Sequence, residues 1–134
     1  MIGILVVTHG SIGEALVTSA SQILGNLPQQ VATLSVWRQD DPDDLVLRAR
    51  ELLEGLDAGD GVLVLTDIFG ATPGNVVSRL LEDGRIEGVS GVSLPMLLRV
   101  LTSRNGSLAS AVQRALSGGA EGLVHMNSDR CCDA

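Results

Sequence analysis

Residues 2–11 read Ile-Gly-Ile-Leu-Val-Val-Thr-His-Gly-Ser, an unbroken apolar run that ends in a short polar segment. An apolar run without alternating polar residues is typical of a strand that is buried on both faces of a sheet. The residues that follow match a capping box at the start of a helix, with Ser11 as the cap and Glu14 three residues later. A buried strand followed at once by a helix predicts a parallel sheet of the α/β class.

The alternation of strands and helices continues along the chain. Gly25-Asn26 ends the first helix, Asp41-Pro42 opens the second, and Thr72-Pro73 opens the third with Thr72 as its cap. Strands are expected over residues 2–8, 31–36, 61–66, 89–94 and 122–126. Helices are expected over 12–24, 73–82, 95–103 and 107–117, and another that starts at Pro42 has an apolar stripe of Leu45, Leu52, Leu53 and Leu56. The core-facing residues of the third helix are expected to be Val76, Val77, Leu80 and Leu81.

These segments predict one doubly wound α/β domain over residues 1–126, followed by a short polar tail over 127–134. We expect a mostly parallel sheet in the order 2-1-3-4, with helices on both faces and right-handed crossovers. Cys131 and Cys132 are adjacent in the polar tail, with no second cysteine pair and no nearby histidine. Neither a disulfide framework nor a metal site is therefore expected.

The composition excludes several classes of function. The net charge is −7 and the isoelectric point about 4.6, which argues against nucleic acid or an anionic membrane as a partner. All nine cationic side chains are arginines, so the chain has no P-loop lysine, Schiff-base lysine or lysine general base. The first apolar run is too short to span a bilayer and no basic region precedes it, so we expect a cytoplasmic protein without membrane insertion.

Polar residues follow the first and third predicted strands. The first strand runs into Thr8-His9-Gly10-Ser11, and the third into a segment that starts at Asp67. In the order 2-1-3-4 these strands are neighbours, and ligands of open parallel sheets collect at the carboxyl ends of such strands. We therefore expect His9 and Asp67 to face each other across a few ångströms.

This pairing suits phosphoryl transfer. A carboxylate that accepts the Nδ1–H of an imidazole leaves Nε2 as a free nucleophile. The helices that begin after both loops can direct amide groups and positive dipole ends at phosphate oxygens. The expected phosphate-binding residues are Gly10, Ser11, Gly70, Ala71 and Thr72. Each residue alone also has an ordinary interpretation as a hydrogen-bonded strand end, a turn cap or a helix start.

Three segments in order resemble one family. The first is Val6-Val7-Thr8-His9-Gly10, the second Asp67 to Asn75, and the third Gly91 to Leu97. They are similar to the motifs of the enzyme IIA component of the mannose-type sugar phosphotransferase system, and the resemblance covers residues 1 to about 126. Gly74 departs from it, because a larger residue is frequent there.

The resemblance implies a phosphotransferase without cofactor, phosphorylated on His9 with Asp67 as its hydrogen-bond partner. The expected donor is the histidine-containing phosphocarrier protein HPr, and the expected acceptor is a separate IIB protein. The family's dimer exchanges an antiparallel C-terminal strand, which corresponds here to about Gly122 to Met126. A homodimer is therefore expected.

Other functions remain alternatives at this point. One is a regulatory IIA protein without a permease, one is the phosphotransfer subunit of dihydroxyacetone kinase, and one is a scaffold with a vestigial site. A receiver module phosphorylated on Asp67 is disfavoured, because receivers need an acidic pair near the first strand and a late lysine. His125, inside the last predicted strand, is expected to have a structural or interface role. Trp37 is left unassigned between core rim and contact surface.

Overall fold

The four-stranded parallel sheet at the centre of the molecule has the expected order. The structure is a computed structural model that describes residues 1–129. Its strands are β1 (Gly3–His9), β2 (Val31–Val36), β3 (Val62–Thr66) and β4 (Ile86–Ser90), arranged β2-β1-β3-β4. All three pairings are parallel, and β1 lies between β2 and β3.

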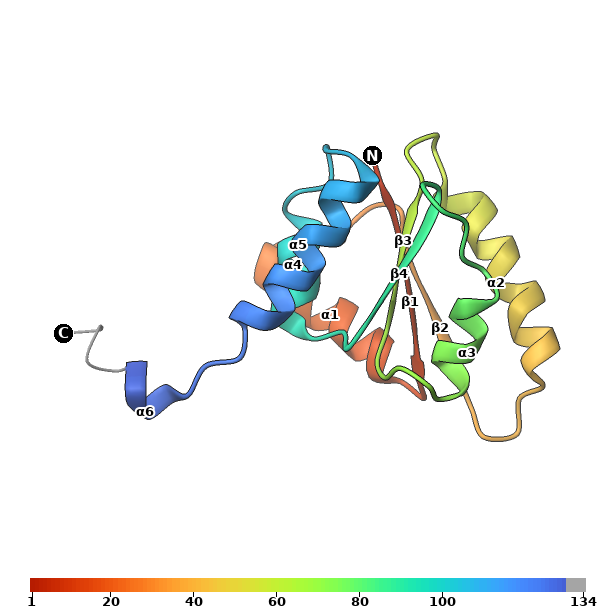
Figure 1. The fold of residues 1–134 in the computed structure, drawn as a ribbon, viewed down its shortest axis with the longest axis horizontal. Helices are drawn as coiled ribbons and strands as arrows, with labels where there is room; N and C mark the ends of the chain where they lie inside the picture. Colours follow the sequence, from red (N-terminus) through yellow and green to blue (C-terminus); the bar gives the residue numbers. More distant parts are fainter. Residues whose placement is uncertain (130–134) are drawn as a thin grey trace.

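Helices cover both faces of this sheet (Figure 1). On one face lie α1 (Ile12–Leu24), α4 (Leu94–Leu101) and α5 (Leu108–Glu121), and on the other α2 (Pro42–Leu56) and α3 (Thr72–Ser78). Leu5 and Val7 of β1 pack toward α2 and α3, while Ile4 and Val6 pack toward the other layer. Both faces of β1 are therefore buried, which explains its continuous apolar sequence. Within residues 1–129 no helix is long and apolar enough to cross a membrane.

The helix starts agree with the sequence only in part. Asp41 caps α2 by accepting the Asp43 N–H at 2.9 Å, as expected. The capping box predicted at the start of α1 is not formed, because the Ser11 side chain makes no cap hydrogen bond. Thr8 Oγ1 accepts the Gly13 N–H instead, at 2.8 Å. Thr72 is likewise the first residue of α3 and not its cap.

The segment between α3 and β4 differs from the expectation. α3 ends at Ser78, Leu81 is 45% exposed, and β4 starts at Ile86 instead of residue 89. The start of β4 was missed in the sequence because Gly88 interrupts its apolar run. A Cβ at Gly88 would lie 3.0 Å from Leu81 and 3.1 Å from Val77, so the helix layer packs directly on this glycine.

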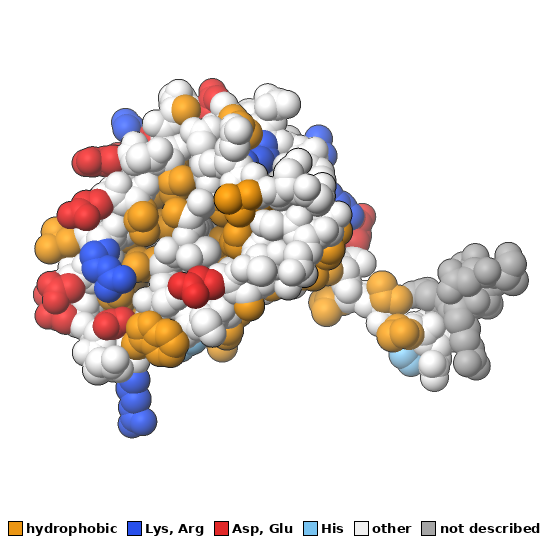
Figure 2. Space-filling view, turned by 180° about the vertical axis from the view of Figure 1, so that it is seen from behind, with side chains coloured by type: hydrophobic (Ala, Val, Ile, Leu, Met, Phe, Trp, Pro, Cys, Tyr) orange, Lys and Arg blue, Asp and Glu red, His pale blue; other side chains and the backbone are white. Residues whose placement is uncertain are grey.

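The strand expected over Gly122–Met126 is not formed in the described single chain. α5 continues to Glu121, and the residues after it lead into the short helix α6 (Met126–Asp129). Figure 1 shows this segment projecting from the domain, and Figure 2 shows hydrophobic side chains exposed on it. A strand this short needs a sheet edge to pair with, and the segment pairs with none within residues 1–129. Cys131, Cys132 and the rest of the tail from residue 130 lie outside the described residues.

Arg104 binds backbone carbonyls at the amino end of the sheet, although no pattern in the sequence indicates this role. The residue is only 7% exposed. Its guanidinium donates to the Ile2 carbonyl at 2.7 and 3.1 Å, to the Gln30 carbonyl at 3.0 Å, and also to the Gln29 carbonyl. These bonds tie the α4–α5 loop to the start of β1 and to the residues before β2.

Candidate functional site

The structure brings His9 and Asp67 together at the carboxyl end of the sheet. His9 is the last residue of β1, and Asp67 directly follows β3, the neighbouring strand. His9 Nδ1 lies 2.8 Å from Asp67 Oδ2, and the same oxygen accepts the His9 backbone N–H at 3.0 Å. The histidine side chain is 49% exposed and the aspartate 14%. The imidazole is thus held by a mostly covered carboxylate and open to solvent.

The ionisation of Asp67 determines which ring nitrogen of His9 is free. Burial disfavours the charged carboxylate, but the hydrogen bonds from the His9 ring and amide outweigh it and hold the pKa of Asp67 below its usual value. Asp67 Oδ1 also accepts the Ile68 N–H at 3.0 Å. An ionised carboxylate only accepts hydrogen bonds, so Nδ1 must carry the proton. In the neutral ring the lone pair is therefore on Nε2.

The loop after β1 places the Ser11 hydroxyl near this histidine, while the Gly10 amide is already occupied. Gly10 has a φ of 50° and donates its N–H to the Val36 carbonyl at 2.9 Å. Ser11 makes no side-chain hydrogen bond within residues 1–129, because Thr8 takes the amide that a cap would take. α1 begins at Ile12, and the amides of a first helical turn lack partners within the helix.

The loop after β3 carries the other expected phosphate-binding residues. Gly70 has a φ of 88°, in the left-handed region, which lets the chain turn back toward the sheet. Ala71 holds the cap position of α3, and Thr72 follows as its first residue without a side-chain cap bond. Gly74 packs against this loop, because a Cβ there would lie 2.8 Å from the Ile68 carbonyl oxygen. This contact explains why Gly74 departs from the family pattern.

Trp37 is a neighbour of this site that the sequence did not assign. A Cβ at Gly10 would lie 3.3 Å from the Trp37 ring, so the indole covers the backbone next to His9. Trp37 is 51% exposed and Phe69, on the loop after β3, is 81% exposed. The predicted strand order already places Trp37 near His9, because Trp37 follows β2 and β2 ends beside β1.

His125 lies away from any strand. It falls between α5 and α6, is exposed, and its carbonyl accepts the Ser128 N–H at 3.0 Å. Among residues 1–129 no group of three or more histidine, cysteine, aspartate or glutamate side chains is arranged to hold a metal ion.

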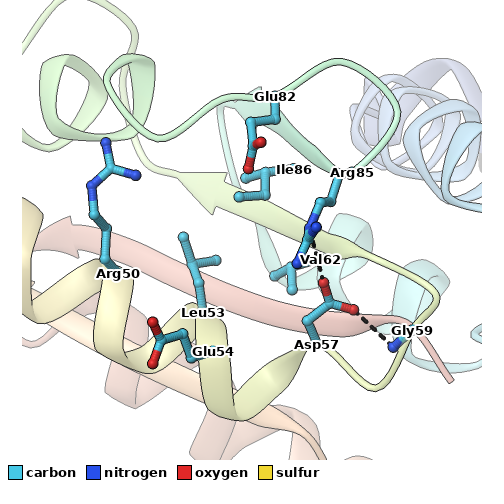
Figure 3. A pocket seen from close by; sticks show the side chains of 9 residues that line it. All are labelled: Arg50, Leu53, Glu54, Asp57, Gly59, Val62, Glu82, Arg85 and Ile86. Atoms are coloured by element: carbon cyan, nitrogen blue, oxygen red, sulfur yellow. Dashed lines mark hydrogen bonds and ion pairs between the residues drawn. The ribbon is translucent and has the colours of Figure 1, made fainter.

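A cavity of about 520 Å³ lies at the opposite end of the sheet (Figure 3). Its apolar lining residues are Leu53, Val62 and Ile86. Asp57 pairs with Arg85 at 3.3 Å. A bond from the Gly59 amide, with the nearby Arg85, holds the pKa of Asp57 below its usual value. None of the expected site residues lines this cavity.

Comparisons with known proteins point to one family. A family model described as PTS system fructose IIA component matches residues 3–116. The mannose-specific EIIAB component of the PTS system from Escherichia coli (strain K12) is 32% identical over 125 residues, 91% of this chain and 38% of that protein. The fructose-specific EIIA component from Bacillus subtilis (strain 168) is 32% identical over 105 residues, 78% of this chain and 71% of that protein.

A solved structure agrees with these sequence relatives. The crystal structure of the phosphotransferase system component EIIA from Streptococcus agalactiae matches with a TM-score of 0.85 and 27% identity, covering 96% of this chain and 99% of that one. The chain spans 38% of the length of its Escherichia coli relative.

Proposed function

Because the chain belongs to the mannose-type family of enzyme IIA components of the sugar phosphotransferase system, we propose that it is a phosphocarrier that is phosphorylated on His9. The observation that supports this most directly is the 2.8 Å contact between His9 Nδ1 and Asp67. It leaves Nε2 as the nucleophile on a half-exposed ring.

The proposed step transfers one phosphoryl group between two imidazoles. The Nε2 lone pair of His9 forms a bond to phosphorus as the P–N bond of phosphorylated HPr breaks, and that bond's electron pair returns to the donor ring. The His9 ring becomes positively charged as it accepts phosphorus, and the Asp67 carboxylate stabilises this charge through Nδ1–H. The reverse of this step, toward a IIB acceptor, uses the same groups.

Ser11, Gly70, Ala71 and Thr72 are proposed to hold the phosphoryl oxygens, and Gly10, whose N–H is already donated to the Val36 carbonyl, is proposed to let the backbone pass close to them. The Ser11 hydroxyl, which has no partner within residues 1–129, and those first-turn amides of α1 that Thr8 does not occupy support this role from one side. The left-handed Gly70 and the open start of α3 support it from the other. Phosphoryl transfer depends mainly on positioning and on stabilising charge, and such a cradle provides both without lysine.

We also propose a cytoplasmic homodimer that exchanges its C-terminal segment. Leu123 and Val124, 85% and 54% exposed, are apolar residues without a place in the single chain. Beside them a cavity of about 380 Å³ lies between the end of β4, α4 and α5. Beyond Ile86, which bridges to Glu82, β4 is also an unpaired edge of the sheet within residues 1–129. Analytical ultracentrifugation at micromolar concentration should show a dimer, and a well-folded monomer would contradict the exchange.

Labelling with phosphoenolpyruvate, enzyme I and HPr tests the function. The protein should become an acid-labile, alkali-stable phosphoprotein, and His9→Ala should take up no label. His125→Ala is the matched control and should be labelled like the wild type. Label on the His9→Ala protein at the wild-type level would contradict the assignment.

A further inference from the structure

The arginines of the described chain are almost all engaged. Arg79, Arg85 and Arg99 pair with carboxylates, while Arg50, Arg104 and Arg114 donate to carbonyl or hydroxyl oxygens. Of the arginines within residues 1–129, only Arg38 and Arg48 have side chains that make no hydrogen bond or ion pair. Both are exposed. A free guanidinium in a chain of net charge −7 is a feature that the fold does not explain.

Arg38 lies at the same end of the sheet as the candidate site. Val36, two residues before it, is paired with His9 in the parallel ladder, and its carbonyl accepts the Gly10 N–H. Trp37 holds the connecting segment against Gly10. Neighbouring strands lie about 4.8 Å apart, so the arginine side chain is long enough to reach the space above His9.

The acids beside Arg38 are already occupied by backbone groups. Asp40 Oδ2 accepts the Trp37 N–H at 2.8 Å, and the Asp40 N–H returns to the Trp37 carbonyl at 3.0 Å. Asp41 caps α2 through the Asp43 N–H. The turn that presents Arg38 is thus held by hydrogen bonds, and its carboxylates accept from backbone amides and make no ion pair with the guanidinium.

Phosphorylation of His9 creates a demand for positive charge at this place. A phosphoryl group carries close to two negative charges at neutral pH, and Asp67 adds a third beside the same ring. The helix start and loop amides offer only partial charges. The chain has no lysine, and the other unpaired arginine of residues 1–129, Arg48, lies in the second turn of α2.

We propose that Arg38 binds the oxygens of the phosphoryl group as it passes between the partner's histidine and His9 Nε2. This inference rests on the proposed function. Arg38 donates N–H bonds to the phosphoryl oxygens while the donor P–N bond breaks and the new P–Nε2 bond forms, and the guanidinium itself is unchanged. A planar guanidinium suits this role because two of its N–H groups can bind two oxygens at once.

The test compares Arg38→Gln, Arg38→Lys and Arg48→Gln with the wild type. Each glutamine variant removes one unpaired positive charge, so Arg48→Gln is matched to Arg38→Gln in net charge. Single-turnover phosphorylation is measured with two donors, phosphorylated HPr and the small molecule phosphoramidate. Circular dichroism and the melting temperature of each variant verify the fold.

Arg38→Gln should slow phosphorylation about tenfold or more with both donors. Arg48→Gln should stay within about twofold of the wild type, because an exposed charge away from the site is screened, and Arg38→Lys should lie between the two. A loss with HPr but not with phosphoramidate would overturn the proposal, because Arg38 would then serve docking alone. Equal rates for both glutamine variants would also overturn it. Label on His9→Ala would contradict the proposed function separately.

Discussion

Replacing Asp67 by asparagine removes the charge that faces the His9 ring and keeps the shape of the side chain. In the wild type, Asp67 Oδ2 accepts from both the ring and the backbone of His9, at 2.8 and 3.0 Å. An asparagine oxygen still accepts these bonds as a neutral group. The fold should therefore persist, while the positively charged ring that forms as phosphorus arrives loses its counter-charge.

The size of the loss follows from this geometry. Opposite charges about 4 Å apart attract by about 4 kcal/mol at an effective dielectric constant of about 20. Because the His9 ring is 49% exposed, solvent screens part of this attraction. We take about 2.7 kcal/mol as the loss of transition-state stabilisation, which corresponds to a rate about 100-fold slower.

Rapid-quench measurement of transfer from phosphorylated HPr gives this rate directly. Asp43→Asn is the matched control, because Asp43 forms an exposed ion pair with Arg79 at 2.9 Å and its loss changes the net charge equally. The control should transfer at close to the wild-type rate. If Asp67→Asn and Asp43→Asn transferred equally fast, Asp67 would not be the functional partner of His9.

Further predictions concern stability. Thr66 Oγ1 is buried and has no hydrogen-bond partner within residues 1–129, so Thr66→Val should raise the free energy of unfolding by about 1 kcal/mol and raise the melting temperature with it. Thr8→Val removes an acceptor that the Gly13 N–H uses, so it should lower the melting temperature in the same calorimetric scan. Arg104→Met should cost about 3 kcal/mol in urea unfolding because buried carbonyls lose their donor, whereas exposed Arg114→Met should change stability by less than about 0.5 kcal/mol. The pKa of Asp57 is lowered in the folded state, so its contribution to the free energy of unfolding is fully present above the unfolded pKa of 3.8 and is lost as pH falls through the lower folded pKa. The difference in unfolding free energy between the wild type and an Asp57→Asn variant should therefore shrink on acidification. A difference that does not change with pH would refute this.

Much of the site was accessible from the sequence because it depends on topology. The apolar runs of β1 and β3 identify buried neighbouring strands, and the polar residues after them must then meet at one sheet edge. His9 and Asp67 could therefore be paired without coordinates. The fold class and strand order were confirmed for the same reason.

The parts that failed depend on contacts between distant segments. Ser11 matched a capping box, but Thr8 from the preceding strand takes the amide. Gly88 interrupted the apolar run of β4, and only the structure shows that Val77 and Leu81 pack too closely on this residue for a larger side chain. Arg104 gave no local signal, since its carbonyl acceptors lie more than 70 residues away along the chain.

The strand predicted over residues 122–126 was wrong within the single chain for another reason. An apolar pattern over residues 122–126 is typical of a strand, but a strand forms only where an edge accepts it. Within one chain Leu123 and Met126 remain exposed. The pattern predicts how the segment can pair, but within residues 1–129 of one chain the segment pairs with no strand.

The central claim is that His9 carries the phosphoryl group on Nε2 while Nδ1 stays bonded to Asp67. Heteronuclear NMR of the phosphorylated protein, labelled with ¹⁵N at histidine, measures this directly through the coupling between phosphorus and the ring nitrogens. We expect a phosphorus coupling to Nε2 of His9 and a retained proton on Nδ1. Phosphorus bonded to Nδ1, or to a residue other than His9, would contradict it.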